Sequence, residues 1–316
     1  FRRVLFRSTA TIDSSYDYTF TGNTAYVYGG AFYTLSSDVI FDGITMTDKN
    51  TANVGGGFAS SGSGRFTIRN GSVISNQTAQ HGGAIYAIGS LTLNNVTFSG
   101  NVATVEGGAV YGNGEITVES ADFSDNESLG TENNNGGGAI YASGTLRLIN
   151  SIFSGNVSNQ DGGAVYGNNN DVTVTNSYFD SNSTTKGNGG GVMLTNASTL
   201  IVTQSTFTNN KSGYDGGAFY AQGETLEIEG CYFEENQAAQ HGGAVYFDQS
   251  SGSPSNSHFS IITSMLRYNS AAGESGGGLH IATNTASIKR CTFDNNVVSG
   301  TGYGGGVYLD TTVVGE

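Results

Sequence analysis

The 316-residue sequence has no tryptophan, a single proline and only two cysteines. Two thiols cannot form the disulfide framework of a small secreted domain. Apolar runs are also short, and none approaches the roughly 18 residues that a membrane-spanning helix needs. These absences exclude a disulfide scaffold and a transmembrane helix, so non-covalent packing must stabilise the fold.

Basic residues are scarce as well, with 12 Lys and Arg against 26 Asp and Glu and a formal net charge of −14. Three of the twelve, Arg2, Arg3 and Arg7, lie in the first eight residues. The remaining chain is too acidic to bind nucleic acid or an anionic membrane. The segment Phe1–Ser8 lacks the long apolar region and cleavage site of a signal peptide. We interpret it as a cloning or sequencing scar or an upstream remnant, and Thr9–Glu316 as a single domain.

Glycine, in contrast, occurs 49 times, and its abundance disfavours helix along most of the chain. Two signatures alternate: a glycine doublet followed by Ala, an aliphatic residue and Tyr, as in residues 82–86, and Phe-x-x-Asn, as in residues 98–101. Regular recurrence of this kind predicts a solenoid. The Phe-x-x-Asn signature or a near relative begins at Phe20, Met46, Val73, Phe98, Phe123, Phe153, Phe179, Phe207, Phe233, Leu266 and Phe293. The glycine doublet begins at Gly29, Gly55, Gly82, Gly107, Gly137, Gly162, Gly190, Gly216, Gly242, Gly277 and Gly305.

Alignment of the copies predicts three short strands in each repeat. The first carries aliphatic residues at alternate positions, as at Leu91 and Leu93, and the second carries a small residue two positions before the Phe. The third follows the glycines, with its aliphatic residue facing inward. Parallel stacking of such repeats, about 4.8 Å apart, predicts an all-β fold, namely a right-handed, three-sided parallel β-helix of about 11 rungs.

Each Phe-x-x-Asn copy is expected to join a structural ladder along the stack. The Phe ring packs against the rings above and below, and the Asn amide bonds to the next Asn while it tolerates the turn backbone. The predicted ladder comprises Phe98, Asn101, Phe123, Asn126, Phe153, Asn156, Phe179, Asn182, Phe207, Asn210, Phe233, Asn236, Phe293 and Asn296.

The pairing of Gly-Gly-Ala-aliphatic with Phe-x-x-Asn resembles the repeats of the chlamydial polymorphic outer-membrane proteins and of other right-handed β-helices. The resemblance covers nearly all of residues 17–308. It implies a non-catalytic, surface-exposed passenger of the autotransporter type, which acts as a stalk, adhesin or interaction scaffold. It also implies a location at the bacterial cell surface or outside the cell. In that family a C-terminal β-barrel exports the passenger, and we therefore expect this sequence to be an internal fragment of a longer chain.

The alternative is a carbohydrate-active β-helix enzyme, either a polysaccharide lyase or a glycoside hydrolase. A lyase needs clustered Asp residues with a basic residue, and a hydrolase needs carboxylates that converge on one face. Beyond Phe1–Ser8 no two neighbouring repeats share a basic position, and Glu106, Asp161 and Asp215 are not in consecutive repeats. His81 and His241 share one repeat position but lie six rungs apart, roughly 29 Å, too far to share a metal. We therefore expect no catalytic residues, no metal and no cofactor.

A series of tyrosines is the candidate binding feature. These residues follow the glycine doublet and are interrupted only by Ala59, Met193 and His280. They are predicted to form a largely solvent-facing stripe, which either stabilises the sheet laterally or binds a glycan or a host-cell protein. The stripe comprises Tyr33, Tyr86, Tyr111, Tyr141, Tyr166, Tyr220, Tyr246 and Tyr308.

Two insertions interrupt the period, at residues 127–135 and at residues 247–258, which include Pro254. Insertions in a solenoid become loops on one face, and they either carry specificity or are merely tolerated there. Cys231 and Cys291 occupy one repeat position two rungs apart, with Ser264 between them. We predict that both are buried and reduced, because their Cα atoms would lie about 9–10 Å apart.

Overall fold

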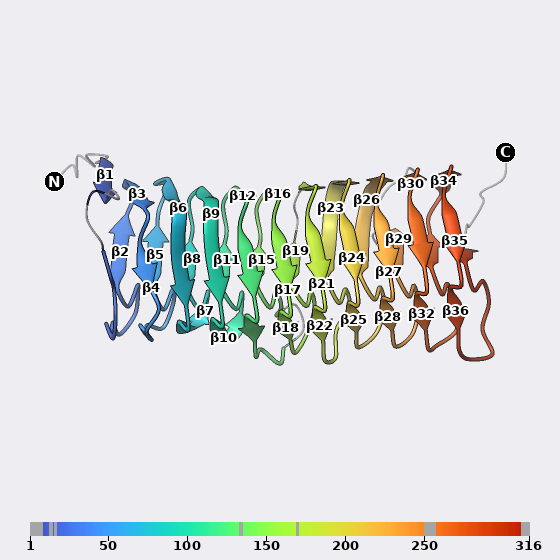
Figure 1. Ribbon diagram of the computed structural model, residues 1–316, viewed down its shortest axis with the longest axis horizontal. Coiled ribbons are helices and arrows are strands. Elements are labelled where there is room, and N and C mark those ends of the chain that lie inside the picture. The colour runs from blue at the N-terminus through green and yellow to red at the C-terminus, as the bar shows by residue number, and fades with distance from the viewer. Residues whose placement is uncertain are drawn as a thin grey trace.

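The chain folds into a rod of stacked turns (Figure 1). The computed structural model describes residues 9–12, 15, 18–132, 135–168, 171–249 and 257–310. In these residues every strand pairing is parallel and no helix occurs, so none of them forms a helix able to cross a membrane. The prediction of an all-β parallel solenoid with about 11 turns is confirmed. Phe1–Ser8, Pro254 and parts of both predicted insertions lie outside the described residues.

Eleven strands follow the glycine turns and form one face of the rod, which we call the tyrosine sheet. Its aliphatic residues, such as Ile85 and Val110, are fully buried, as predicted. The strands are β2 (Phe32–Leu35), β5 (Phe58–Ser61), β8 (Ile85–Ala87), β11 (Val110–Gly112), β15 (Ile140–Ala142), β19 (Val165–Asn168), β23 (Val192–Thr203), β26 (Phe219–Glu229), β29 (Val245–Gln249), β33 (Leu279–Ala282) and β37 (Val307–Asp310).

Two further faces follow in each turn. The aliphatic sheet contains β1 (Thr9–Ile12), β3 (Asp38–Asp42), β6 (Phe66–Ser75), β9 (Leu91–Ser99), β12 (Ile116–Glu119), β16 (Leu146–Ile149), β20 (Val172–Thr175), β30 (His258–Ile262) and β34 (Thr285–Lys289), with the second halves of β23 and β26. The phenylalanine sheet contains β4 (Thr45–Met46), β13 (Asp122–Ser124), β17 (Ile152–Ser154), β21 (Tyr178–Asp180), β24 (Thr206–Thr208), β27 (Tyr232–Glu234), β31 (Met265–Arg267) and β35 (Thr292–Asp294), with the second halves of β6 and β9. Long strands that continue around a corner therefore connect the three faces.

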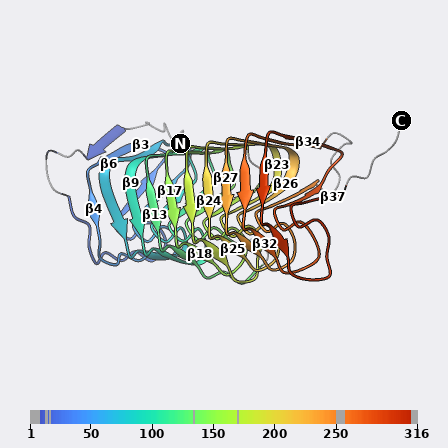
Figure 2. The same cartoon turned by 45° about the vertical axis from the view of Figure 1, so that its right-hand side comes forward.

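A fourth, narrow sheet closes each turn between the phenylalanine sheet and the glycines (Figures 1 and 2). Most of its strands have two residues, too few to show an alternating pattern in the sequence, and this sheet was not predicted. It contains β7 (Thr78–His81), β10 (Val102–Glu106), β14 (Glu127–Ser128), β18 (Val157–Ser158), β22 (Ser183–Thr184), β25 (Lys211–Ser212), β28 (Gln237–Ala238), β32 (Ser270–Ala271) and β36 (Val297–Val298).

Phenylalanine rings fill the centre of the rod. The ring centroids of Phe123 and Phe153 lie 4.9 Å apart, those of Phe153 and Phe179 lie 4.7 Å apart, and the rings are nearly parallel. Phe98 to Phe233 all take part in this column and are fully buried, whereas Phe293 in a terminal turn is only partly buried. Stacked rings of this kind contribute more than their buried area alone.

The Asn residues of the ladder bond from turn to turn. Asn156 Nδ2 donates to Asn182 Oδ1 at 2.9 Å and to the carbonyl oxygen of Phe123 at 2.9 Å. The Asn156 amide N–H also donates to Asn182 Oδ1, at 3.0 Å. The same arrangement continues from Asn101 to Asn296, so each buried amide is satisfied by its neighbours.

Two repeat positions differ from the prediction by one residue. Ile74, not Val73, lies beside Phe98, because Asn70-Gly71 adds a residue at the corner and shifts the register. At three sites with three consecutive glycines the turn begins at the first glycine, so Gly189, Gly276 and Gly304 replace the predicted starts at 190, 277 and 305. The third glycine then takes the place that Ala has elsewhere.

Both cysteines are free, and Ser264 lies between them as predicted, accepting a hydrogen bond from the Cys231 amide at 3.0 Å. Cys231 is buried, but Cys291 is only partly buried. The prediction that both are buried is therefore wrong for Cys291, which lies in a terminal part of the stack where described turns cover it on one side only.

Candidate functional site

The glycine turns determine where the tyrosines lie. Gly82 has a φ of +60°, a left-handed conformation that side chains disfavour. A Cβ atom on the next residue, Gly83, would overlap the carbonyl oxygen of Gly108 in the following turn. Consecutive turns can therefore stack in direct contact, and the residue four positions after the first glycine falls in one column along the rod.

The tyrosine column consists of the predicted tyrosines together with Ala59, Met193 and His280. Rings of Tyr86, Tyr111 and Tyr141 stack at centroid distances of 4.9 and 5.1 Å, with interplanar angles of 7° and 5°. A second stack begins at Tyr220 and Tyr246, whose ring centroids lie 5.0 Å apart. It continues through His280 to Tyr308.

The middle of this column is buried. Tyr166 has no exposed surface, and Tyr141 is 8% exposed. With Met193 they form a hydrophobic cluster of their own, against which Tyr111 and Tyr220 pack. The prediction of a largely solvent-facing stripe is wrong here, because the stacked rings and Met193 cover each other's faces. At the N-terminal end of the column Tyr33 is 42% exposed.

The buried hydroxyls remain protonated at neutral pH. Burial raises the pKa of Tyr141 to about 12, and the nearby Glu106 carboxylate acts in the same direction. Burial also raises the pKa of Tyr166 to about 12. The hydroxyls of Tyr141 and Tyr166 are therefore too weakly acidic to act as nucleophiles at neutral pH.

Two acidic residues, Asp161 and Asp215, directly precede glycine doublets at the edge of the tyrosine column. Each accepts a hydrogen bond from a backbone amide in the next turn of the solenoid. Asp161 Oδ1 accepts from the Asn188 amide at 2.8 Å, and Asp215 Oδ1 accepts from the His241 amide at 2.9 Å. Burial raises the pKa of Asp161, and the hydrogen bonds that Asp161 accepts from Asn188 act in the opposite direction. The carboxylates cap turns of the backbone, and they lie in alternate turns as the sequence predicted.

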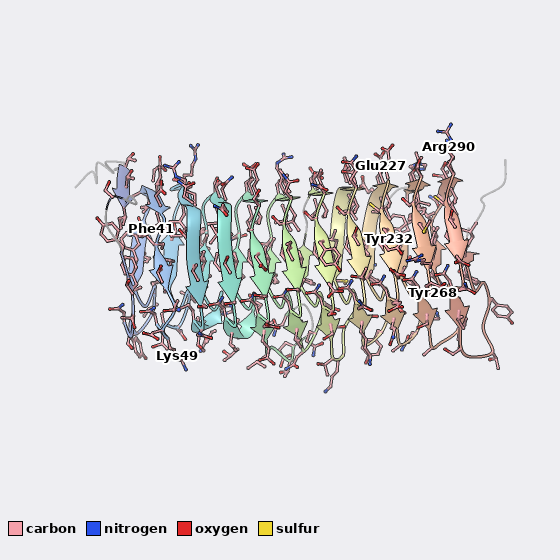
Figure 3. The ribbon with its side chains drawn as sticks, in the orientation of Figure 1. Phe41, Lys49, Glu227, Tyr232, Tyr268 and Arg290 are labelled. Carbon is pink, nitrogen blue, oxygen red and sulfur yellow. The ribbon has the colours of Figure 1, made fainter. Side chains whose placement is uncertain are left out.

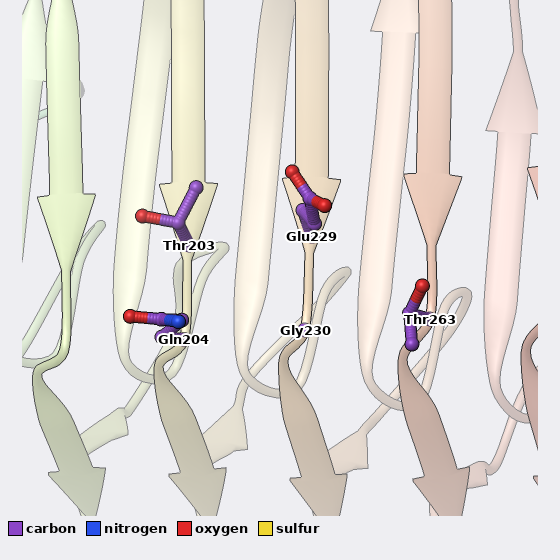
Figure 4. Close-up of a pocket in the computed structure, with 5 residues that line it drawn as sticks. All are labelled: Thr203, Gln204, Glu229, Gly230 and Thr263. Carbon is purple, nitrogen blue, oxygen red and sulfur yellow. The ribbon is translucent and has the colours of Figure 1, made fainter.

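Surface hollows occur where the aliphatic sheet meets the phenylalanine sheet. One hollow of about 350 Å³ is lined by Thr203, Gln204, Glu229, Gly230 and Thr263 (Figure 4). The neighbouring hollow, of about 210 Å³, is lined in part by Glu227, Glu229 and His258. Glu229 lines both hollows and Glu227 lines the second, and both side chains point outward from β26.

Comparison with known families agrees with this architecture. The family model for the right handed beta helix region matches residues 109–265 and 181–313. The chain belongs to the right-handed β-helix family. The model of the Chlamydia polymorphic membrane protein repeat matches residues 17–35 and 95–113 of this β-helix. Both matches confirm the resemblance drawn from the two signatures. A search of curated proteins and a search of solved structures each found no match.

Histidines lie beside the tyrosine column of the β-helix at two places. His81 Nδ1 lies 3.0 Å from Glu106 Oε1 in the next turn. Near the other end, the Ser275 hydroxyl lies 2.9 Å from His241 Nδ1 and 2.7 Å from His280 Nδ1. Sequence reasoning missed this second cluster because His280 was treated only as an interruption of the tyrosines. In the part of the chain that the structure describes, no three His, Cys, Asp or Glu residues are grouped so that they could hold a metal ion.

Another set of exposed side chains lies on the outside of the phenylalanine sheet and was also missed. Each strand there buries its Phe, so the residue before it faces outward. Tyr178 is 39% exposed, Ile152 45% and Met265 36%, and Tyr268, in the bend directly after β31, is 47% exposed. The signal was present in the sequence as apolar residues directly before the ladder positions. Tyr232 on β27 occupies the same position as Tyr178 and is half-buried. We call Ile152, Tyr178, Tyr232, Met265 and Tyr268 the outer aromatic face.

Proposed function

We propose that this β-helix is a non-catalytic passenger at the bacterial surface, of the autotransporter type, which serves as a stalk and adhesin. The matches to the Chlamydia polymorphic membrane protein repeat support a surface location. A rod of directly stacked turns suits a stalk, since it holds side chains at fixed spacing far from an anchoring point. The partner would be a host-cell protein or a glycan.

The observation that carries the proposal is the exposed aromatic surface on a rigid parallel sheet. Contiguous apolar surface on a protein marks sites at which partners or ligands bind. Preformed side chains on such a frame would be ordered before binding, which reduces the entropy cost of association. The tyrosine column is proposed as a second element of the scaffold. Its buried centre, at Tyr141 and Tyr166, would act in stability, and docking would fall to less buried members such as Tyr33 and Tyr86.

The test uses fluorescent beads coated with the full chain and applied to cultured host cells. We expect beads that carry the folded chain to adhere more than beads coated with an unrelated β-helix of similar charge. Equal adhesion would contradict the adhesin proposal. The same chain is incubated with a panel of polysaccharides, and we expect no release of reducing ends or unsaturated products.

A carbohydrate-active enzyme is the second candidate, favoured by the two carboxylates at the hollows beside β26. Glu227 and Glu229 point to one side of the sheet, as the acid pair of a hydrolase would. This alternative would be established if the unaltered chain cleaves a polysaccharide and each of the variants Glu227→Gln and Glu229→Gln does not. Glu224→Gln, also on β26 but not among the residues lining either hollow, is the matched control.

A further inference from the structure

We infer that the outer aromatic face binds an uncharged linear glycan that lies along the rod axis. This inference rests on the proposed scaffold function and specifies its ligand and its location. It assigns the binding surface to the phenylalanine sheet between β17 and β31.

The aromatic rings of this face are held in place before any ligand binds. The Tyr178 hydroxyl lies 3.0 Å from Thr208 Oγ1, and the Tyr232 hydroxyl donates to Glu234 Oε2 at 2.8 Å. Arg267 pairs with Glu234 at 2.7 Å, and its guanidinium lies 5.1 Å from the Tyr232 ring centroid and 5.7 Å from that of Tyr268. Figure 3 shows Tyr232 and Tyr268 in the C-terminal half of the rod.

Hydrogen-bonding groups flank the rings, as sugar hydroxyls require. Asp180 accepts from Thr208 at 2.6 Å, from Asn209 at 3.0 Å and from Ser181 at 3.0 Å. Partial burial opposes ionisation of Asp180, but these hydrogen bonds outweigh it and hold its pKa below the ordinary value. Asp180 is therefore ionised at neutral pH. Apolar C–H faces of sugars pack on aromatic rings, while their hydroxyls donate to carboxylates at the edge.

The charges of the face select against acidic ligands. Asp180 and Glu234 contribute two carboxylates, and the basic side chain among these residues, Arg267, is already paired with Glu234. A uronate or sulfate group placed here would lie beside an ionised carboxylate, and like charges in contact are unfavourable. The chain as a whole has a net charge of −14, which adds to the repulsion. An uncharged glycan avoids this cost.

The geometry of the stack indicates a linear ligand. Ile152, Tyr178, Thr206, Tyr232 and Met265 follow one another in neighbouring turns in a single column. Neighbouring turns are about 4.8 Å apart, so Tyr178 and Tyr232 are separated by roughly 10 Å. That separation corresponds to two sugar units of an extended β-linked chain. Each turn would therefore face one unit, and the five turns would accommodate about five.

Calorimetric titration of the full chain with uncharged β-linked glucose oligomers of two to six units tests the inference. We expect affinity to rise with length up to about five units, and oligomers of uronic acid to bind at least tenfold more weakly. The double substitution Tyr178→Ala and Tyr268→Ala should weaken binding at least tenfold while the circular-dichroism spectrum is unchanged. Tyr178→Phe, which keeps the ring, and Tyr303→Ala, an exposed tyrosine in another turn, should bind as the unaltered chain does.

Stronger binding of the acidic oligomers, or unchanged affinity in the folded double variant, would overturn the inference. If no uncharged oligomer binds although coated beads still adhere to cells, the glycan assignment fails and the scaffold function stands. If the beads also fail to adhere, the proposed function fails with it.

Discussion

Within single turns, the Phe column supplies six of the large side chains that are fully buried in the rod, from Phe98 to Phe233. Phe153 is fully buried between two stacked neighbours, and its loss would leave a cavity that the regular backbone cannot collapse to fill. We expect Phe153→Ala to lower the free energy of unfolding by about 3–5 kcal/mol. Urea unfolding measures this, with Ser154→Ala, on the outward side of the same strand, as the control. Equal midpoints for the two variants would show that the ring is not part of the core.

The Asn ladder makes a separate contribution through hydrogen bonds. Asn156→Ala would remove the Nδ2 donor to the Phe123 carbonyl oxygen in the interior. It would also remove the Oδ1 acceptor of the Asn126 backbone amide and of one Asn126 Nδ2 hydrogen. An unsatisfied buried group costs about 1–3 kcal/mol, and we expect a loss of that size. Asn159→Ala, which removes a side chain at the exposed end of the same turn, should change stability by less than about 1 kcal/mol. A smaller effect at Asn156 than at Asn159 would contradict the ladder.

His280 gives one pH dependence that can be assigned to a residue. Burial and the neighbouring His241 lower the pKa of His280 from an ordinary 6.5 to about 4. The unfolded chain binds this proton more readily, so the folded state loses stability as the pH falls from 6.5 towards 4. His280→Phe keeps a ring between Tyr246 and Tyr308 but cannot bind this proton. Over this pH range we expect the variant to lose less unfolding free energy than the unaltered chain does, and the difference should reach up to roughly 3 kcal/mol.

Urea unfolding of both proteins at pH 7 and at pH 4.5 measures the difference. Acidic residues also titrate in this interval, but they are present in both proteins and cancel in the comparison. His258→Phe, at a partly exposed position on β30, is the control and should follow the unaltered chain. Parallel pH profiles for His280→Phe and the unaltered chain would show that His280 does not titrate as assigned.

At the scale of the element, the glycine turn determines how closely the strands approach. Gly83→Ala would place a methyl group against the backbone of the next turn, where no flexible side chain can move aside. We expect a loss of at least about 2 kcal/mol, as for overpacking in a rigid core. Gly71→Ala is the control, because an added Cβ at Gly71 meets nothing within 4 Å. Gly71 has a positive φ of +74°, which Gly83 lacks, so backbone strain adds a cost to the control variant only. Thermal unfolding compares them, and a larger effect at Gly71 would contradict close packing as the reason for the doublet.

For the whole molecule, each turn makes the same contacts with its neighbours, so one complete turn can be removed and the turns on either side of it can pack together. Deletion of Ile140–Ala164 joins Ala139 to Val165 and brings Tyr111 against Tyr166, in the same register as before. Since the stability of a solenoid is a sum over turns and their interfaces, we expect the shortened chain to fold with a small decrease in unfolding midpoint.

Deletion of Ile140–Gly163 is the matched control, because it leaves one extra residue in the strand and misplaces the inward-facing side chains of that turn. We expect it to be several kcal/mol less stable than the in-register deletion, as misplaced core side chains are. Circular dichroism and thermal unfolding distinguish the two. Equal stability would mean that register does not govern this fold.

Most of the fold could be predicted from the sequence because the same short pattern is repeated in every turn. Alternation at Leu91 and Leu93, repeated in the other copies, was enough to assign an inward face. Errors arose where a single residue altered the count, as at Asn70-Gly71, or where a strand was too short to show a period, as at Val157–Ser158. The outer aromatic face was missed because the exposed residues before each Phe differ from copy to copy and so do not form a repeated signature.

The sequence by itself determined the parallel stack, its number of turns and the residues that point inward, since periodic patterning acts locally and is the same in each copy. Burial along the tyrosine column was decided only by the tertiary structure. Tyr166 and Tyr33 occupy the same repeat position, yet one is fully buried and the other 42% exposed. Exposure depends on which side chains from neighbouring turns cover a ring, and those neighbours lie outside the repeat that the pattern describes. The physical reason is that the side chains in the turns on either side cover a ring: Tyr166 packs with Tyr141 and Met193, whereas Tyr33 has the small Ala59 beside it.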